Sequence, residues 1–122
     1  MENDSLEYIL DHYKNPRNFG TIEDADISYE EGILSCGDVI RLDLKIRNNK
    51  LEDIKFSGTG CAISQASVSI LTENVTGKEI EDVISLTDHD MLEALGGQVS
   101  PIRFKCALLG LTVLKKALTE RR

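Results

Sequence analysis

The chain has 122 residues and a formal net charge of −7, which argues against nucleic acid as its main partner because phosphate binding needs a basic surface. Hydrophobic residues make up 41% of the chain, and a domain of this size can bury a core without disulfide bonds. The N-terminus shows no secretory signal and no apolar run is long enough to cross a bilayer, so we expect a cytoplasmic protein without a membrane partner.

The first segment of the chain predicts a helix. Over residues 4–14 apolar side chains recur at helical spacing, and the Asn15-Pro16 pair is expected to end the helix because proline disfavours helical backbone in the residue before it. Residues 15–26 are expected to form a loop with several acidic side chains. The apolar face of the helix would consist of Leu6, Ile9, Leu10 and Tyr13.

A small sheet is expected next. Apolar and charged residues alternate from Ile40 to Arg47, which is typical of a half-buried strand. The pair Asn48-Asn49 is a turn signal, and Ile54 and Phe56 indicate the returning strand. Residues 27–34 supply a third strand with a weaker alternation.

The second half of the chain predicts helices. One begins at Ala62 and ends near Thr76-Gly77, and two short helices are expected over residues 78–86 and 88–95. Ser100-Pro101 is expected to open the last helix, with serine as N-cap and proline in the first helical position. The first of these helices would carry a small-residue face of Ala62, Ala66, Ser69 and Ile70, and the last would carry an apolar stripe of Leu108, Leu111, Val113, Leu114 and Leu118.

This order of helix, strands and helices predicts an α+β fold, in which helices pack on one face of a small antiparallel three-stranded sheet. No internal repeat, low-complexity stretch or linker divides the chain. We therefore expect a single domain over residues 1–122.

The three cysteines of the chain are the clearest candidates for metal binding or thiol chemistry. They are Cys36, Cys61 and Cys106. Their odd number and the lack of an export signal argue against disulfides, and no Cys-x-x-Cys pair supports a zinc finger. Cys61 and Cys106 are expected near helix N-termini and Lys105 adds a cation, and both features lower a thiol pKa. Asp38 lies two residues after Cys36, so both side chains can face the same side of an extended segment.

Three thiolates and one carboxylate would supply four ligands, a set that suits tetrahedral zinc or the iron of an iron–sulfur cluster. The spacing alone leaves open whether the cysteines converge, because each cysteine could equally be a small buried side chain. The two histidines are assigned to no metal. His12 is expected to meet the C-terminus of the first helix, and His89 lies near the start of a later one.

Four ordered motifs extend this interpretation. They are His12-Tyr13-Lys14-Asn15-Pro16-Arg17-Asn18, Ser35-Cys36-Gly37-Asp38, Gly58-Thr59-Gly60-Cys61-Ala62-Ile63-Ser64 and Arg103-Phe104-Lys105-Cys106-Ala107. Together they resemble the U-type iron–sulfur scaffold family, which comprises IscU, SufU and the N-terminal domain of NifU. The resemblance covers nearly the whole chain.

The resemblance implies a SufE/NifU-like fold with the three cysteines and the aspartate at one exposed end. It implies a scaffold, not an enzyme, that receives sulfur from a cysteine desulfurase, assembles a [2Fe–2S] cluster and passes it to apo iron–sulfur proteins. Cys36, Cys61 and Cys106 would bind iron and accept sulfur, and Asp38 would be the weaker fourth ligand because a hard carboxylate suits a soft cluster poorly. Zinc could fill the same site, and a metal- or cluster-dependent homo-oligomer is expected.

Two departures from the family pattern keep an alternative open. Lys105 stands where the IscU branch has histidine and looks like the SufU branch, which implies a zinc-dependent sulfurtransferase with zinc on Cys36, Asp38 and Cys61. The spacing from Cys61 to Cys106 is too short for the insertion that the SufU branch carries. Residues 99–103, read in the IscU branch by a dedicated Hsp70-type chaperone, match that branch only in part. A structural zinc domain or a binding module without a metal is the third alternative.

Overall fold

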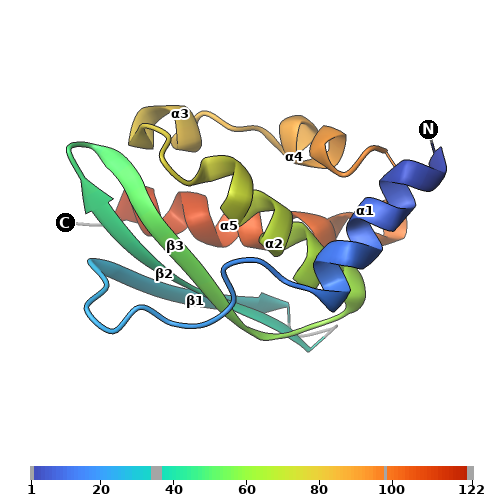
Figure 1. Ribbon diagram of the computed structural model, residues 1–122, viewed down its shortest axis with the longest axis horizontal. Coiled ribbons are helices and arrows are strands. Elements are labelled where there is room, and N and C mark those ends of the chain that lie inside the picture. Colours follow the sequence, from blue (N-terminus) through green and yellow to red (C-terminus); the bar gives the residue numbers. More distant parts are fainter. Residues whose placement is uncertain (1, 34–36, 98, 121–122) are drawn as a thin grey trace.

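The computed structural model describes residues 2–33, 37–97 and 99–120, with side chains described from residue 6 onward. The elements follow the predicted order of a helix, a sheet and further helices (Figure 1). They are α1 (Glu2–Lys14), β1 (Ile27–Ile33), β2 (Asp38–Arg47), β3 (Lys50–Thr59), α2 (Ala62–Val75), α3 (Ile80–Ile84), α4 (Asp88–Ala94), the 3₁₀ turn η1 (Pro101–Arg103) and α5 (Phe104–Glu120). Among the described residues, none of the helices has the length and hydropathy needed to span a membrane.

The sheet is antiparallel with the strand order β1-β2-β3. Its second hairpin turns at Asn48 and Asn49, whose φ angles of 53° and 63° place both in the left-handed region. Two consecutive residues with positive φ form the tight turn that matches the twist of paired strands, and asparagine tolerates this conformation better than most residues. The predicted turn and the strands on either side of it are therefore confirmed.

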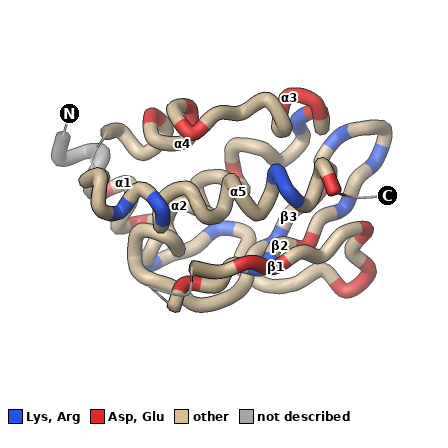
Figure 2. Tube along the Cα trace, turned by 180° about the vertical axis from the view of Figure 1, so that it is seen from behind, with Lys and Arg blue, Asp and Glu red and all other residues tan. Residues whose placement is uncertain are grey.

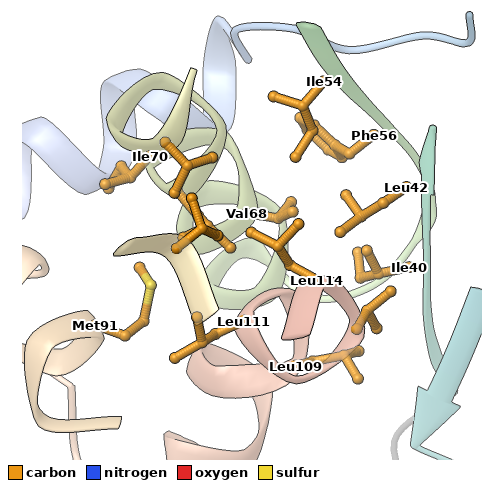
Figure 3. Close-up of a cluster of buried hydrophobic side chains, with 14 of the residues drawn as sticks. Ile40, Leu42, Ile54, Phe56, Val68, Ile70, Met91, Leu109, Leu111 and Leu114 are labelled. Atoms are coloured by element: carbon orange, nitrogen blue, oxygen red, sulfur yellow. The ribbon is translucent and has the colours of Figure 1, made fainter. Parts of the chain in front are cut away.

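One face of this sheet is covered by α2 and α5, as the fold class predicted. Alternate residues of β2 point toward these helices, and aliphatic side chains from both helices meet them in the core (Figure 3). Burying one such side chain contributes about 1.5–3 kcal/mol. The side chains that form the centre of the core include Ile40, Leu42, Ile54, Phe56, Val68, Ile70, Leu111 and Leu114.

The short helices α3 and α4 form an outer layer against α5, on the side away from the sheet (Figure 1). A capping box begins α4, in which the Thr87 hydroxyl accepts from Asp90 N–H and the Asp90 carboxylate accepts from Thr87 N–H. Acidic side chains gather on this outer layer (Figure 2). Part of the negative net charge of the chain therefore lies away from the sheet.

The apolar face predicted for α1 is wrong. Ile9 is buried, but Leu6 is 49% exposed, and Leu10 and Tyr13 are also exposed. The residue that anchors this helix is His12, which is fully buried against α2 instead of meeting the end of its own helix. The polar residue His12 thus makes the buried contact of α1 that hydrophobic periodicity predicted for apolar residues.

A set of polar contacts, which we call the His12 cluster (His12, Arg17, Ser69, Thr72 and Glu73), joins α1 to α2. His12 Nδ1 lies 2.7 Å from Ser69 Oγ, and the backbone N–H of Arg17 donates to the same oxygen at 2.8 Å. The Thr72 hydroxyl donates to the Ser69 carbonyl, and Glu73 Oε1 lies 3.4 Å from His12 Nε2. This cluster holds the motif that begins at His12 onto the middle of α2.

The small-residue face predicted for α2 is buried at Ala66, Ser69 and Ile70, whereas Ala62 in the first turn is exposed. The predicted start of the last helix needs correction. The last α-helix begins at Phe104, since the residues after Ser100 form a 3₁₀ turn in which the serine side chain makes no capping bond. Proline does occupy the first position of that turn, as predicted.

Candidate metal centre

Three segments that are distant in sequence meet at one end of the sheet. Asp38 is the first residue of β2, Cys61 is the N-cap of α2 directly after β3, and Cys106 lies in the first turn of α5. The start of β2, the end of β3 and the starts of both helices lie together at the right of Figure 1. One carboxylate oxygen of Asp38 and the two sulfur atoms all lie within 4.8 Å of one another.

Glycines next to the site allow the strands and side chains to approach this closely. At Gly60, a β-carbon would lie 3.2 Å from the Asp38 carboxylate and would collide with the Ser64 hydroxyl. At Gly58 the φ angle is +124°, and a β-carbon would collide with the Val39 carbonyl. The Ser64 hydroxyl therefore occupies space that a side chain at position 60 would take, and the Asp38 carboxylate borders the same space.

Asp38 is fixed by contacts with Cys61. The backbone N–H of Cys61 donates to Asp38 Oδ1 at 3.1 Å, and the Cys61 sulfur lies 3.7 Å from Oδ2. Asp38 is only 2% exposed and Cys106 only 5%, whereas Cys61 is half-buried. The expectation of an exposed site is thus wrong for Asp38 and Cys106, since both side chains are buried.

The two thiols differ in acidity. Burial raises the pKa of Cys61, but hydrogen bonds from the backbone N–H and hydroxyl of Ser64, and from the Cys106 thiol, outweigh it and leave this pKa below its ordinary value. Burial, followed by the hydrogen bonds to Asp38 and Cys61, raises the pKa of Cys106 to about 12. Cys61 is therefore the more readily ionised thiol, and Cys106 keeps its proton between a carboxylate and a sulfur.

The raised pKa of Cys106 contradicts the prediction that a helix N-terminus and an adjacent lysine would lower it. Burial opposes ionisation of the Cys106 thiol most strongly, and the hydrogen bonds to Asp38 and Cys61 and the charge of these two groups act in the same direction. Lys105 itself is exposed and lines an open cavity with Glu31 and Asp88. Its predicted influence on the neighbouring thiolate stays a prediction.

The other residues singled out from the sequence lie elsewhere. Cys36 falls in the segment 34–36, outside the described residues, so its predicted place as a fourth ligand stays a prediction. His12 belongs to the His12 cluster, and His89 is exposed on α4, 3.6 Å from Glu93. In the part of the chain that the structure describes, Asp38, Cys61 and Cys106 are the group of three potential ligands that comes together.

The sequence motif that contains Cys61 also includes Ser64, a residue next to this site for which no role was predicted. Ser64 is 1% exposed, and its hydroxyl lies over Gly60 between Cys61 and Asp38. Its place three residues after Cys61, within the first turn of the helix that Cys61 caps, is the signal that could have identified it. Side chains at this spacing lie on the same face of a helix.

Comparison with known proteins agrees with this arrangement. The family model described as "NifU-like N terminal domain" matches residues 5–121. The chain belongs to this family. Over 112 residues it is 39% identical to the iron-sulfur cluster assembly scaffold protein IscU 1 of Archaeoglobus fulgidus, a match that covers 92% of this chain and 72% of that protein.

Other relatives of the family carry a second functional name. The chain is 38% identical over 131 aligned positions to the zinc-dependent sulfurtransferase SufU of Bacillus subtilis, covering 93% of this chain and 88% of that protein. The crystal structure of a putative SUF-system scaffold protein from Fervidobacterium islandicum superposes with a TM-score of 0.76 at 32% identity, covering 92% and 94% of the two chains. The resemblance to the U-type scaffolds and the predicted α+β fold are confirmed.

The donor set of the site fits either metal chemistry of these relatives. Two thiols and a carboxylate within 4.8 Å of one another supply sulfur and oxygen ligands at a mutual distance that one metal ion can bridge. Thiolates bind zinc and the iron of clusters well, and the carboxylate is the harder and weaker partner of such soft centres. The centre is therefore suited to zinc or to iron with sulfide.

Proposed function

We propose that this protein is a scaffold on which a transient [2Fe–2S] cluster is assembled. Cys36, Cys61, Cys106 and Asp38 would hold the cluster, which is cargo that the protein gains and gives up. The observation that carries the proposal is the convergence of Asp38, Cys61 and Cys106 within 4.8 Å, on a chain that belongs to the NifU-like N-terminal domain family.

The acidity of the two thiols supports a role in sulfur uptake. Cys61, with a pKa below its ordinary value, is the cysteine of the described site that is more readily a thiolate. A thiolate attacks the outer sulfur of a persulfide, so that a new S–S bond forms on this chain while the donor keeps its own sulfur as a thiolate. No net oxidation is required. Cys106 and Cys36 are the other candidate sulfur acceptors.

The proposal includes the partners that this chemistry needs. A cysteine desulfurase would supply the persulfide, and apo iron–sulfur proteins would receive the cluster. Such a protein acts as a carrier in the cytoplasm, and a cluster- or metal-dependent homo-oligomer would shield the cargo. The segment around η1 matches the chaperone-binding pattern of the IscU branch at Pro101, while the residues next to this proline differ from it.

A zinc-dependent sulfurtransferase is the second candidate, favoured by one feature, Lys105 directly before Cys106. In that function zinc would rest on Cys36, Asp38 and Cys61, and Cys106 would leave the metal to accept sulfur. The 38% identity with a relative of that name supports keeping this candidate.

The two functions are separated by the metal content of the protein purified without oxygen. Iron, acid-labile sulfide and zinc should be quantified for each chain. We expect iron and sulfide in comparable amounts with little zinc, and reconstitution with iron, cysteine and a desulfurase should yield a cluster that an apo-ferredoxin can take up. A protein that holds zinc, takes up sulfur from the desulfurase and never yields a transferable cluster would favour the sulfurtransferase instead.

A further inference from the structure

We propose that Cys61 and Cys106 form a redox pair that turns the sulfur of a persulfide into free sulfide. In this reaction Cys61 carries the persulfide, and the Cys106 thiol attacks the sulfur of Cys61 itself. A disulfide forms between the two cysteines, and hydrogen sulfide leaves. The inference rests on the proposed function, because it concerns the fate of sulfur that the chain has taken up.

The two sulfur atoms are close enough to react after a small rotation. They lie within 4.8 Å of each other, and a disulfide holds its sulfur atoms about 2 Å apart. The Cys61 side chain makes no capping hydrogen bond within the described chain, and its sulfur lies 3.7 Å from Asp38 Oδ2, a long contact. Rotation about the single side-chain torsion of Cys61 can therefore bring its sulfur toward Cys106 without moving the backbone.

The helices that carry the two cysteines keep them side by side. Cys61 is the N-cap of α2, Cys106 lies in the first turn of α5, and these helices pack against each other. A β-carbon at Gly110 would lie 3.0 Å from the Val68 side chain, so the helices approach closely one turn after Cys106. Two thiols held in this way react within one molecule, without the entropy cost of bringing them together.

The exposure of the two thiols assigns their roles. Cys61 is half-buried, so a persulfide donor can reach it, whereas Cys106 is only 5% exposed. Sulfur therefore enters at Cys61, and Cys106 reacts with the sulfur that Cys61 already carries. The same burial protects Cys106 from reaction with thiols and disulfides in solution.

The reaction balances without a further reactant. A bond forms between the two cysteine sulfurs, the bond from the Cys61 sulfur to the outer sulfur breaks, and the outer sulfur leaves with the proton of Cys106. Oxidation of two thiols to one disulfide supplies two electrons, which reduce the delivered sulfur atom to sulfide. Hydrosulfide is a weaker base than an ordinary thiolate and is therefore the better leaving group. A dithiol reductant then restores both thiols.

The first test loads the metal-free chain with glutathione persulfide, removes the excess and measures sulfide released without an added reductant. We expect about one sulfide per chain, together with a Cys61–Cys106 disulfide in peptide mass spectra. Cys106→Ser should keep the persulfide on Cys61 and release less than about a tenth as much sulfide. The control His89→Gln, a change at an exposed residue of α4, should match the parent.

The parent protein alone can refute the inference. A chain that keeps its persulfide with Cys106 still a free thiol, that takes up no sulfur at Cys61, or that releases sulfide with a disulfide to Cys36 would overturn it. The proposed function is judged separately, with a desulfurase as donor. If the desulfurase loaded no sulfur but glutathione persulfide gave sulfide and the disulfide, the proposed function would fail and the redox pair would stand.

The second test needs neither a sulfur donor nor a metal. In a Cys36→Ser chain, which leaves Cys61 and Cys106 as its two cysteines, equilibrium with oxidised and reduced glutathione gives the effective concentration of one thiol at the other. We expect a value in the folded chain at least on the order of tenfold above the value in urea, because folding holds the pair together. An equal or lower value in the folded chain would contradict the redox pair.

Discussion

Two buried polar groupings lie along α2, and they differ in what their atoms can do for one another. In the His12 cluster, the His12 ring and the Arg17 backbone N–H meet the Ser69 hydroxyl, and the Thr72 hydroxyl donates to the Ser69 carbonyl. At the N-terminal end of the helix, Asp38, Cys61 and Cys106 bring together three groups that each become an anion on losing a proton.

Because of this difference, the buried polar groups of the His12 cluster serve the structure, and those of Asp38, Cys61 and Cys106 can serve chemistry. The hydrogen bonds to Ser69 fix the position of α1 on α2, and burial disfavours a charge on the His12 ring, since it lowers the pKa of this residue. Three groups that can all be anionic are held together by protons, as the pKa of about 12 for Cys106 shows, or by a cation. The first grouping should matter for stability and the second for binding.

The largest effect is expected when a ligand of the site is removed. Four-ligand zinc sites bind with about 10–16 kcal/mol, so Cys106→Ala should cost on the order of 3 kcal/mol or more, beyond a hundredfold in zinc affinity. Chelator competition measures this loss. The exposed His89→Ala variant is the control, and a Cys106→Ala protein with the affinity of the parent would remove Cys106 from the ligand set.

Removal of His12 should instead affect stability more than metal binding. His12→Ala removes a fully buried ring and leaves Ser69 without this partner, so the free energy of unfolding should fall by about 2–3 kcal/mol. Urea denaturation followed by circular dichroism gives this value. Zinc affinity of the folded protein should stay within about threefold of the parent. A large loss of affinity with little loss of stability would reverse the assignment of the two groupings.

Acid should weaken the His12 cluster as well. Burial lowers the pKa of His12 in the folded protein, Arg17 acts in the same direction, and Glu73 and Asp11 oppose them. Because the unfolded chain takes up this proton more readily, the contribution of His12 to stability is present above the ordinary histidine pKa of 6.5 and is lost as pH falls below it, by at most about 1.4 kcal/mol per pH unit.

Thermal unfolding near pH 7.5 and near pH 5.5 tests whether His12 causes this loss of stability. The proteins to compare are the parent, His12→Gln and His89→Gln. His12→Gln should show a smaller decrease than the parent, while His89→Gln, which changes an exposed histidine, should match the parent. If both variants matched the parent, the acid sensitivity would come from other groups.

The smallest effect is expected at Ser67, a buried hydroxyl that belongs to neither grouping. It has no hydrogen-bond partner among the described residues, so Ser67→Ala should raise the free energy of unfolding by up to about 1 kcal/mol. Denaturation measures the gain, and zinc affinity should not change. Destabilisation by more than about 1 kcal/mol would mean that the hydroxyl has a partner in solution.

Much of the fold could be predicted because it follows local rules. The alternation in β2 and the Asn48-Asn49 turn are properties of adjacent residues, and they identified the hairpin. The face of α1 could not be predicted in this way, since it depends on which side meets α2. There the decisive contact is polar, between His12 and Ser69, and hydrophobic periodicity carries no signal for it.

The candidate site shows the same division. The motifs named Asp38, Cys61 and Cys106 correctly as residues to examine, and the structure brings them together. The acidity of Cys106 follows from its burial and from neighbours 45 or more positions away in the chain, since Cys106 lies beside Cys61 and Asp38. Adjacent sequence, including Lys105, could not reveal that balance.

The separation of these residues along the chain has a consequence for the binding of a metal or cluster. Asp38 begins one strand of a hairpin, Cys61 follows the end of the other strand, and Cys106 reaches them only when α5 has docked, so a partly folded chain offers no more than fragments of the site. Under the proposed function, loading and folding would thus be one linked equilibrium. A partner protein that loosened the first turn of α5 would lower the affinity for the bound group without competing for a single ligand, so the packing of that turn would control its release.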